Sequence, residues 1–127
     1  MNNGNIIYKE LSYQINGILF YVHNELGSYC NEQQYCDAIE KQLQQKSIKY
    51  EREKKLPPSF EGEENRNKID FLINNKIILE IKAKRFVTRE DYYQVRRYLK
   101  ALKLKLGIIV NFRDRYLHPK RILNSLI

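Results

Sequence analysis

Two short apolar segments carry charged residues at positions where a buried strand tolerates them poorly. They are residues 68–73 (KIDFLI) and 77–82 (IILEIK), and residues 74–76 join them. Burying a carboxylate or an ammonium group in such a β-branched run is costly unless another group compensates the charge. A divalent metal ion is the usual compensation for two close carboxylates. The two segments therefore predict a hairpin in which Asp70 and Glu80 are candidate metal ligands.

The length of the connecting turn decides whether the two carboxylates meet. A two-residue loop would turn Asp70 and Glu80 to opposite faces, whereas a three-residue loop, residues 74–76, would place them directly opposite each other. Lys82 shares a face with Glu80 in either case, because side chains alternate along a strand. Two interpretations are open here. A metal site requires the longer loop or a bulge, and the alternative is a solvated face with Glu80 and Lys82 as a surface ion pair.

The spacing of apolar residues predicts helices and strands on both sides of this hairpin. The order α-α-β-β-β-α-β-α favours an α/β (α+β) fold, with a mixed four-stranded sheet flanked by helices. We expect all 127 residues to form one domain. The expected elements are helices at 6–26 and 32–46, a strand at 48–56, a loop at 59–67, the hairpin strands, a helix from Thr88 to about Leu106, a strand at 107–112 and a short helix from about Pro119.

The net charge of +8 is large for this length and unevenly distributed. Nine Lys or Arg residues lie between positions 82 and 105, against two acidic residues. A basic domain suggests a polyanionic partner, and nucleic acid is the commonest one. The plainer alternative is a solubilising helix surface.

The remaining composition narrows the class of protein. No apolar run approaches the roughly 18 residues that span a membrane, and the N-terminal residues lack the layout of a signal peptide. Cys30 and Cys36 are expected to be reduced thiols, and they lack the partners of a zinc site. These features predict a cytoplasmic protein.

Three more residues outside the hairpin are candidates for the site. Glu32 lies on the apolar face of its helix, where it either caps the helix or points at the carboxylate pair. Gln94 and Tyr98 lie four apart on the third helix. A glutamine can orient a scissile phosphate or a water, whereas an exposed helix position is the simpler interpretation. The basic residues of the same helix suit phosphate contacts.

The chain resembles the PD-(D/E)XK nuclease superfamily. Asp70, a gap of nine residues and then Glu80-Ile81-Lys82 match its motif, and the predicted elements match its α-β-β-β-α-β core. Residues 94–98 (QVRRY) are similar to a QxxxY motif found in part of the superfamily. Residues 22–27 (VHNELG), followed by Glu32 and Tyr35, resemble the hallmark of the GxxExxY proteins, a PD-(D/E)XK-like microbial family, although Tyr29 stands where its members usually carry a glycine.

This resemblance implies a metal-dependent nuclease that hydrolyses phosphodiester bonds, in DNA in preference to RNA. Asp70, Glu80 and the backbone carbonyl of Ile81 would bind Mg²⁺ or Mn²⁺. Glu32 would hold a second metal or an outer-shell water, Lys82 would position the attacking water, and Gln94 would orient the nucleophile or the substrate.

The resemblance also implies a surface for nucleic acid. Its expected members are Lys84, Arg85, Arg96, Arg97, Tyr98 and Lys100. The alternative function is a non-catalytic module on the same fold that binds nucleic acid or another protein. The small size of the chain makes a homodimer or an accessory protein partner a reasonable source of specificity.

Overall fold

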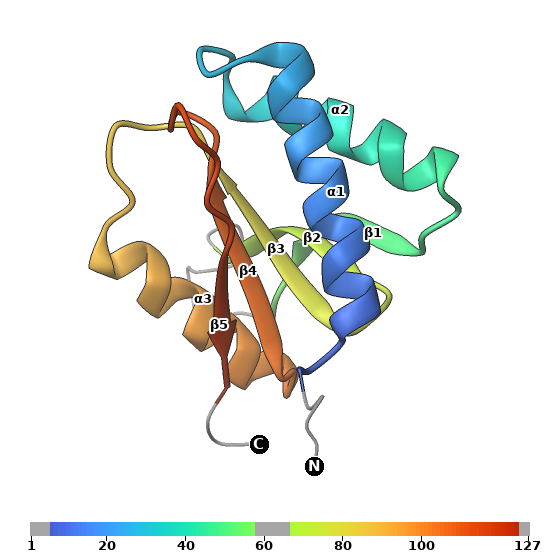
Figure 1. Cartoon of the computed structure of the whole chain (residues 1–127). Helices are drawn as coiled ribbons and strands as arrows, with labels where there is room; N and C mark the ends of the chain where they lie inside the picture. Colours follow the sequence, from blue (N-terminus) through green and yellow to red (C-terminus); the bar gives the residue numbers. More distant parts are fainter. Residues whose placement is uncertain (1–5, 58–66, 125–127) are drawn as a thin grey trace.

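The computed structural model describes residues 6–57 and 67–124, and it contains one mixed sheet. In chain order the elements are α1 (Lys9–Leu26), α2 (Glu32–Gln45), β1 (Tyr50–Lys55), β2 (Lys68–Ile73), β3 (Ile77–Lys82), α3 (Arg89–Leu102), β4 (Leu106–Asn111) and β5 (Lys120–Leu123) (Figure 1). The strands lie side by side in sequence order. Among the described residues only β3 and β4 pair in parallel, because α3 carries the chain back along the sheet so that β4 begins beside the start of β3.

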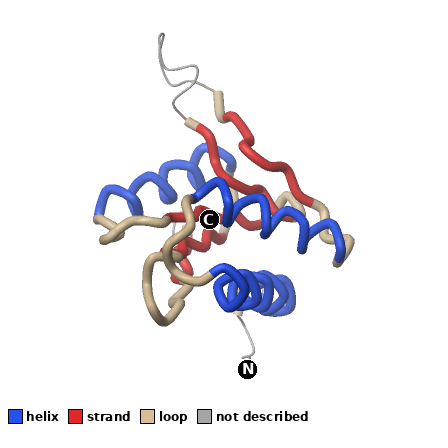
Figure 2. Tube along the Cα trace, turned by 90° about the horizontal axis from the view of Figure 1, so that it is seen from above, coloured by secondary structure: helices blue, strands red, loops and turns tan. Residues whose placement is uncertain are grey.

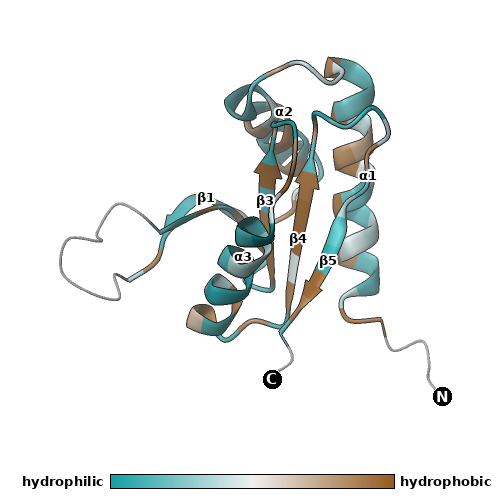
Figure 3. Cartoon of the chain, turned by 90° about the vertical axis from the view of Figure 1, so that its left-hand side faces the viewer, coloured by the Kyte–Doolittle hydropathy of each residue, from teal (hydrophilic) through white to brown (hydrophobic). Residues whose placement is uncertain are grey.

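Helices cover both faces of the sheet. In Figures 2 and 3 the strands lie between α3 on one side and α1 with α2 on the other. The larger core joins α1 and α2 to the sheet through residues such as Leu19, Ile39 and Phe71. The smaller core joins α3 to the opposite face, where Val95 and Leu99 are fully buried. In the described ranges no helix is long and apolar enough to cross a membrane.

Side-chain caps fix the points at which α2 and α3 begin. Asn31 caps α2, and its side chain accepts from the backbone N–H of Gln34. Thr88 forms the same kind of reciprocal box with Asp91 at the start of α3. Both caps use residue types that favour helix N-termini. The position of these caps matters below, because Glu32, the first residue of α2, and Gln94, in the second turn of α3, line the same pocket.

The register of α3 on the sheet depends on a glycine. A Cβ atom at Gly107 of β4 would lie 2.6 Å from Cγ1 of Val95. Any larger residue at this position therefore forces the Val95 side chain, or the helix that carries it, to shift. The glycine lets the helix approach the strand closely, and it thereby sets the distance between α3 and the charged residues of β3.

The predicted mixed sheet with flanking helices is confirmed, but it has five strands rather than four. The predicted short helix from about Pro119 is wrong, because Lys120–Leu123 pairs antiparallel with β4 as an edge strand. Only Ile122 of this segment is buried, which suits one face of an edge strand. The third helix also ends earlier than predicted, since Lys103 adopts a left-handed conformation (φ 57°) and Leu106 belongs to β4. Of the predicted loop 59–67, residues 59–66 lie outside the described residues.

Candidate active site

The turn between β2 and β3 has three residues, as a site at Asp70 and Glu80 requires. Ile73 pairs with Ile77, so that residues 74–76 form the loop. Asn74 and Asn75 both adopt left-handed conformations (φ 53° and 55°), which asparagine tolerates better than most residues. This register continues to the pair Phe71 and Leu79. Asp70 and Glu80 are the next residues along the two strands, and a hydrogen bond joins them.

Beyond the last backbone pair of β2 and β3, the side chains of Asp70 and Glu80 supply the hydrogen bonds between the two strands. The backbone N–H of Asp70 donates to Oε2 of Glu80 at 2.7 Å, and the N–H of Ile81 donates to Oδ2 of Asp70 at 2.7 Å. On the other side of β2, Glu53 of β1 has a left-handed conformation (φ 53°), and the register omits it. The sheet is therefore interrupted around Asp70, and the two carboxylates are held on the same side of the hairpin.

Burial makes both carboxylates difficult to ionise. The side chain of Glu80 is only 3% exposed, and burial together with the charge of Asp70 raises its pKa to about 8. Burial also raises the pKa of Asp70, and the charge of Glu32 adds to this rise. Two neighbouring carboxylates in such a place are destabilising unless a positive group lies between them.

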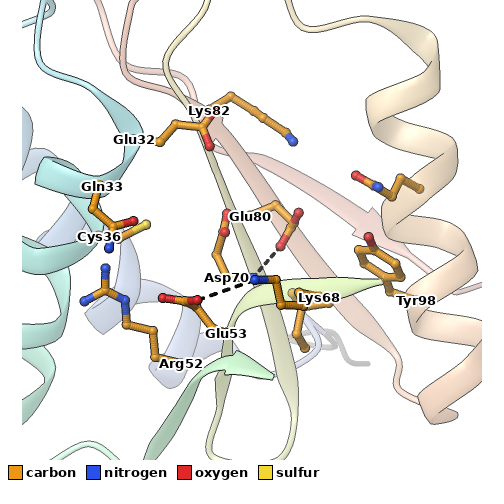
Figure 4. Close-up of a pocket in the computed structure, with 12 residues that line it drawn as sticks. Glu32, Gln33, Cys36, Arg52, Glu53, Lys68, Asp70, Glu80, Lys82 and Tyr98 are labelled. Atoms are coloured by element: carbon orange, nitrogen blue, oxygen red, sulfur yellow. Dashed lines mark hydrogen bonds and ion pairs between the residues drawn. The ribbon is translucent and has the colours of Figure 1, made fainter. Parts of the chain in front are cut away.

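The carboxylates open into a pocket of about 340 Å³ between α2 and α3. Figure 4 shows Glu32, Gln33 and Cys36 of α2 approaching from one side and Tyr98 of α3 from the other. The residues around the pocket are predominantly polar or charged, unlike the mostly apolar lining of small-molecule pockets. The full lining is Glu32, Gln33, Cys36, Arg52, Glu53, Lys68, Ile69, Asp70, Glu80, Lys82, Gln94 and Tyr98.

Lys82 connects the pocket to the first turn of α3. Its Nζ lies 3.8 Å from Oδ1 of Asp91, and Nζ of Lys84 lies 2.6 Å from Oδ2 of the same carboxylate. Although burial opposes it, the bonds from Lys84 and Thr88 lower the pKa of Asp91. Asp91 therefore stays ionised and holds the ammonium group of Lys82 at the rim of the pocket.

Comparison with known families agrees with this geometry. A model of the PD-(D/E)XK nuclease superfamily matches residues 9–122. The chain belongs to this superfamily. A search of curated proteins and a search of solved structures each found no match. The predicted superfamily is thereby confirmed, and the finer assignment to the GxxExxY proteins stays a prediction.

The residues that the sequence predicts for the PD-(D/E)XK motif lie on the two strands of the hairpin. Asp70 is on β2, and Glu80 and Lys82 are on β3. Nucleases of this superfamily act on nucleic acid and generally use divalent metals such as Mg²⁺. The sequence order of the motif and the three-residue turn together explain why three charged groups meet at the end of an otherwise apolar hairpin.

The donor set suits one hard cation. Each carboxylate uses one oxygen on a backbone N–H, so that the second oxygen of Asp70 and of Glu80 can face a ligand. Mg²⁺ is commonly held by one or two carboxylates and keeps several waters. Within the described ranges no group of three or more His, Cys, Asp and Glu side chains is arranged to hold a metal. Glu32 therefore lines the pocket without joining the pair in one ligand cluster.

Of the residues predicted for the site and for nucleic-acid binding, some line the pocket and others are exposed outside it. Gln94 and Tyr98 both line the pocket. Tyr98 is only 2% exposed, and burial together with the charge of Glu80 raises its pKa to about 12. Its ring is thus packed in the smaller core between α3 and the sheet. The other predicted contacts lie outside the pocket lining, and those exposed to solvent are Arg85, Arg96, Arg97 and Lys100.

Arg52 is a pocket residue that sequence reasoning missed. Its Nη1 pairs with Asp37 at 2.8 Å and with Glu40 at 2.9 Å, whereas its Nη2 is buried without a hydrogen-bond partner in the described part of the chain. The signal was available, because β1 alternates in burial and Arg52 occupies an inward position. Cys36 was missed as well, but burial and the charge of Asp70 raise its pKa and keep it a thiol.

Proposed function

We propose that this protein is a metal-dependent nuclease that hydrolyses phosphodiester bonds, in DNA in preference to RNA. The observation that carries the proposal is the pair of neighbouring carboxylates of Asp70 and Glu80, of which Glu80 is buried and Asp70 half-buried. Burying this pair is costly, and a bound cation would reverse that cost. A site that is unfavourable until it binds its ligand is expected at a catalytic centre and has no evident structural purpose.

Asp70, Glu80 and the backbone carbonyl of Ile81 would hold Mg²⁺ or Mn²⁺. When bound, such an ion polarises a phosphate oxygen and lowers the pKa of a coordinated water. The hydrogen bonds from the backbone of Asp70 and Ile81 orient both carboxylates. The two strands therefore position the ligands before any substrate arrives.

The remaining pocket residues supply positive charge and orientation. Lys82 lies on the same face as Glu80, where its ammonium group can stabilise the negative charge that develops on the phosphate during attack. Gln94 can orient the attacking water or the scissile phosphate, and Glu32 can hold an outer-shell water from the α2 side. Arg52, which also lines the pocket, adds a further positive charge there.

The exposed basic residues of α3 suit the phosphates that flank the scissile bond. Arg96, Arg97 and Lys100 are exposed on the helix whose second turn contributes Gln94 to the pocket. Contacts of this kind position the substrate without reading its sequence. They also predict that binding weakens steeply as the salt concentration rises.

A nuclease assay with Mn²⁺ tests the proposal on single-stranded and double-stranded DNA and RNA. The wild-type protein should cut at least one form, and Glu80→Ala and Lys82→Ala should each lower the rate by about 100-fold or more. Lys41→Ala changes an exposed lysine of α2 outside the pocket and should cut like the wild type. Equal cutting by all four proteins would indicate a contaminating nuclease. Binding without cutting by the wild type would favour the non-catalytic module.

A further inference from the structure

Three loops at one end of the sheet each expose a large aromatic side chain. Tyr29 lies in the α1–α2 loop, Phe86 in the β3–α3 loop and Tyr116 in the β4–β5 loop, and they are 88%, 70% and 67% exposed. Figure 1 shows these loops gathered at the end of the sheet where β3 and β4 finish. A cluster of exposed rings on ordered loops is unusual for a surface without a partner.

An arginine lies over each of the three rings. The guanidinium of Arg113 is 5.6 Å from the ring centroid of Tyr29, and that of Arg85 is 5.6 Å from Phe86. The guanidinium of Arg115 is 5.3 Å from the ring of Tyr116. We call these three pairs the aromatic–arginine surface. Each pair combines a flat face for stacking with a positive charge.

Hydrogen bonds of Arg113 join the three loops. Its Nε donates to the backbone carbonyl of Ser28 at 3.0 Å, and its Nη2 donates to that of Ala83 at 3.3 Å. The side chain of Asn111 adds a second link, since it donates to the carbonyl of Lys84 at 2.6 Å and accepts from its N–H at 3.1 Å. The rings are therefore presented by loops that are already ordered, which lowers the entropy lost on binding a ligand.

The aromatic–arginine surface borders the candidate active site along the chain. Tyr29 lies three residues before Glu32, and Phe86 lies four residues after Lys82. Both neighbours line the pocket. Two of the three loops therefore begin or end next to a residue of the pocket lining.

We propose that the aromatic–arginine surface binds unpaired bases of a single-stranded nucleic acid and leads the strand into the pocket. This inference rests on the proposed nuclease function and specifies its substrate as single-stranded. Aromatic rings stack on unpaired bases of any sequence, whereas the bases of a duplex already stack on one another. The arginines add contacts to the phosphates. A protein partner also favours Tyr and Arg, but the net charge of +8 and an arginine at every ring favour a polyanion.

Binding measured by fluorescence anisotropy in EDTA tests this inference separately from catalysis. The probes are labelled oligo-dT, labelled oligo-U and a labelled hairpin duplex of similar length. Alanine at Tyr29, Phe86 or Tyr116 should each weaken single-strand binding about 5-fold or more, because stacking contributes this much per base. The same changes should leave duplex binding unaltered, and Tyr29→Phe and Tyr116→Phe should bind like the wild type.

Tyr13→Ala is the matched control, because Tyr13 is 78% exposed on α1 and lies outside the three loops. It should leave every affinity unchanged. The inference is wrong if the triple alanine variant binds oligo-dT and oligo-U as tightly as the wild type, and the surface would then serve a protein partner. A wild type that binds single strands through these rings but never cuts with Mn²⁺ would overturn the nuclease proposal and leave this one standing. The ratio of the affinities for oligo-dT and oligo-U shows whether the surface prefers DNA or RNA.

Discussion

The backbone N–H of Asp70 donates to the carboxylate of Glu80 at 2.7 Å, so a side chain joins the hairpin where a backbone bond would be expected. This contact holds two carboxylates close together in a buried place. The negative charges of the two carboxylates therefore lower the free energy of unfolding of the metal-free protein. Unfolding measurements on variants can test this.

Glu80→Gln should stabilise the metal-free protein. The amide keeps an oxygen that can accept from Asp70 and removes a buried carboxylate whose pKa burial raises to about 8. We expect a gain of roughly 1–2 kcal/mol in the free energy of unfolding, or about 4–8 °C in the melting temperature of a domain of this size. Chemical denaturation in EDTA near neutral pH measures it. A variant less stable than the wild type would show that Glu80 serves the fold and would remove the main support for a metal site.

The stability of the metal-free protein should fall as the pH rises from 4.5 to about 8. Over this window the unfolded chain has released the proton of Glu80, whereas the folded chain still holds it, because the folded pKa is raised from 4.5 to about 8. The unfolded state binds fewer protons there, and stability falls with rising pH. The measurement is the difference in unfolding free energy between the wild type and Glu80→Gln across the window. A difference that does not vary with pH would contradict the raised pKa.

Mn²⁺ should stabilise the wild type and leave Asp70→Ala unchanged. At a metal concentration about 100 times the dissociation constant, the gain is ~2.7 kcal/mol. It should be larger at about pH 8 than at about pH 6, because metal ligands must lose their protons first. Thermal unfolding with and without the ion measures the gain. An equal gain in Asp70→Ala would place the metal elsewhere on the protein.

The sequence predicted the geometry of the hairpin because its signal is local. Period-two alternation and a countable turn were enough to state that Asp70 and Glu80 meet only across a three-residue loop or a bulge, and the register shows the three-residue loop. The caps at Asn31 and Thr88 were predictable for the same reason, since each depends on a few adjacent residues.

The features that the sequence did not reveal depend on contacts between distant segments. The last strand forms because Lys120–Leu123 pairs with the edge of β4. Four residues after a proline are too few to show the alternation that would predict a strand. Arg52 joins the pocket because β1 lies beside β2, and its role follows from the fold rather than from its neighbours in the chain. The aromatic–arginine surface likewise depends on three loops that meet only in the folded protein.

Lys82 and Lys84 should differ in their kinetic roles although both contact Asp91. Only Lys82 lines the pocket, so that Lys82→Ala should lower kcat by about 100-fold or more with little change in KM. Lys84→Ala should instead raise KM several-fold and leave kcat nearly unchanged, as the loss of a phosphate contact does. Steady-state cleavage of a labelled oligonucleotide separates the two constants. Equal losses of kcat in both variants would indicate that they act only by holding Asp91.

Gly107→Ala should destabilise the protein and disturb the site together. The new methyl group would lie 2.6 Å from Cγ1 of Val95, and the Val95 side chain, or the helix that carries it, must shift to relieve the contact. Overpacking of this kind costs about 1–3 kcal/mol. Because α3 also carries Gln94, the rate of cleavage should fall in the protein that remains folded.

The matched control is Gly17→Ala in α1, where a Cβ meets nothing within 4 Å and helix propensity favours alanine by about 0.5–1 kcal/mol. Urea unfolding and the cleavage rate of both variants check the prediction, and a Gly107→Ala protein with wild-type stability and rate would show that the close approach of α3 to β4 is not required.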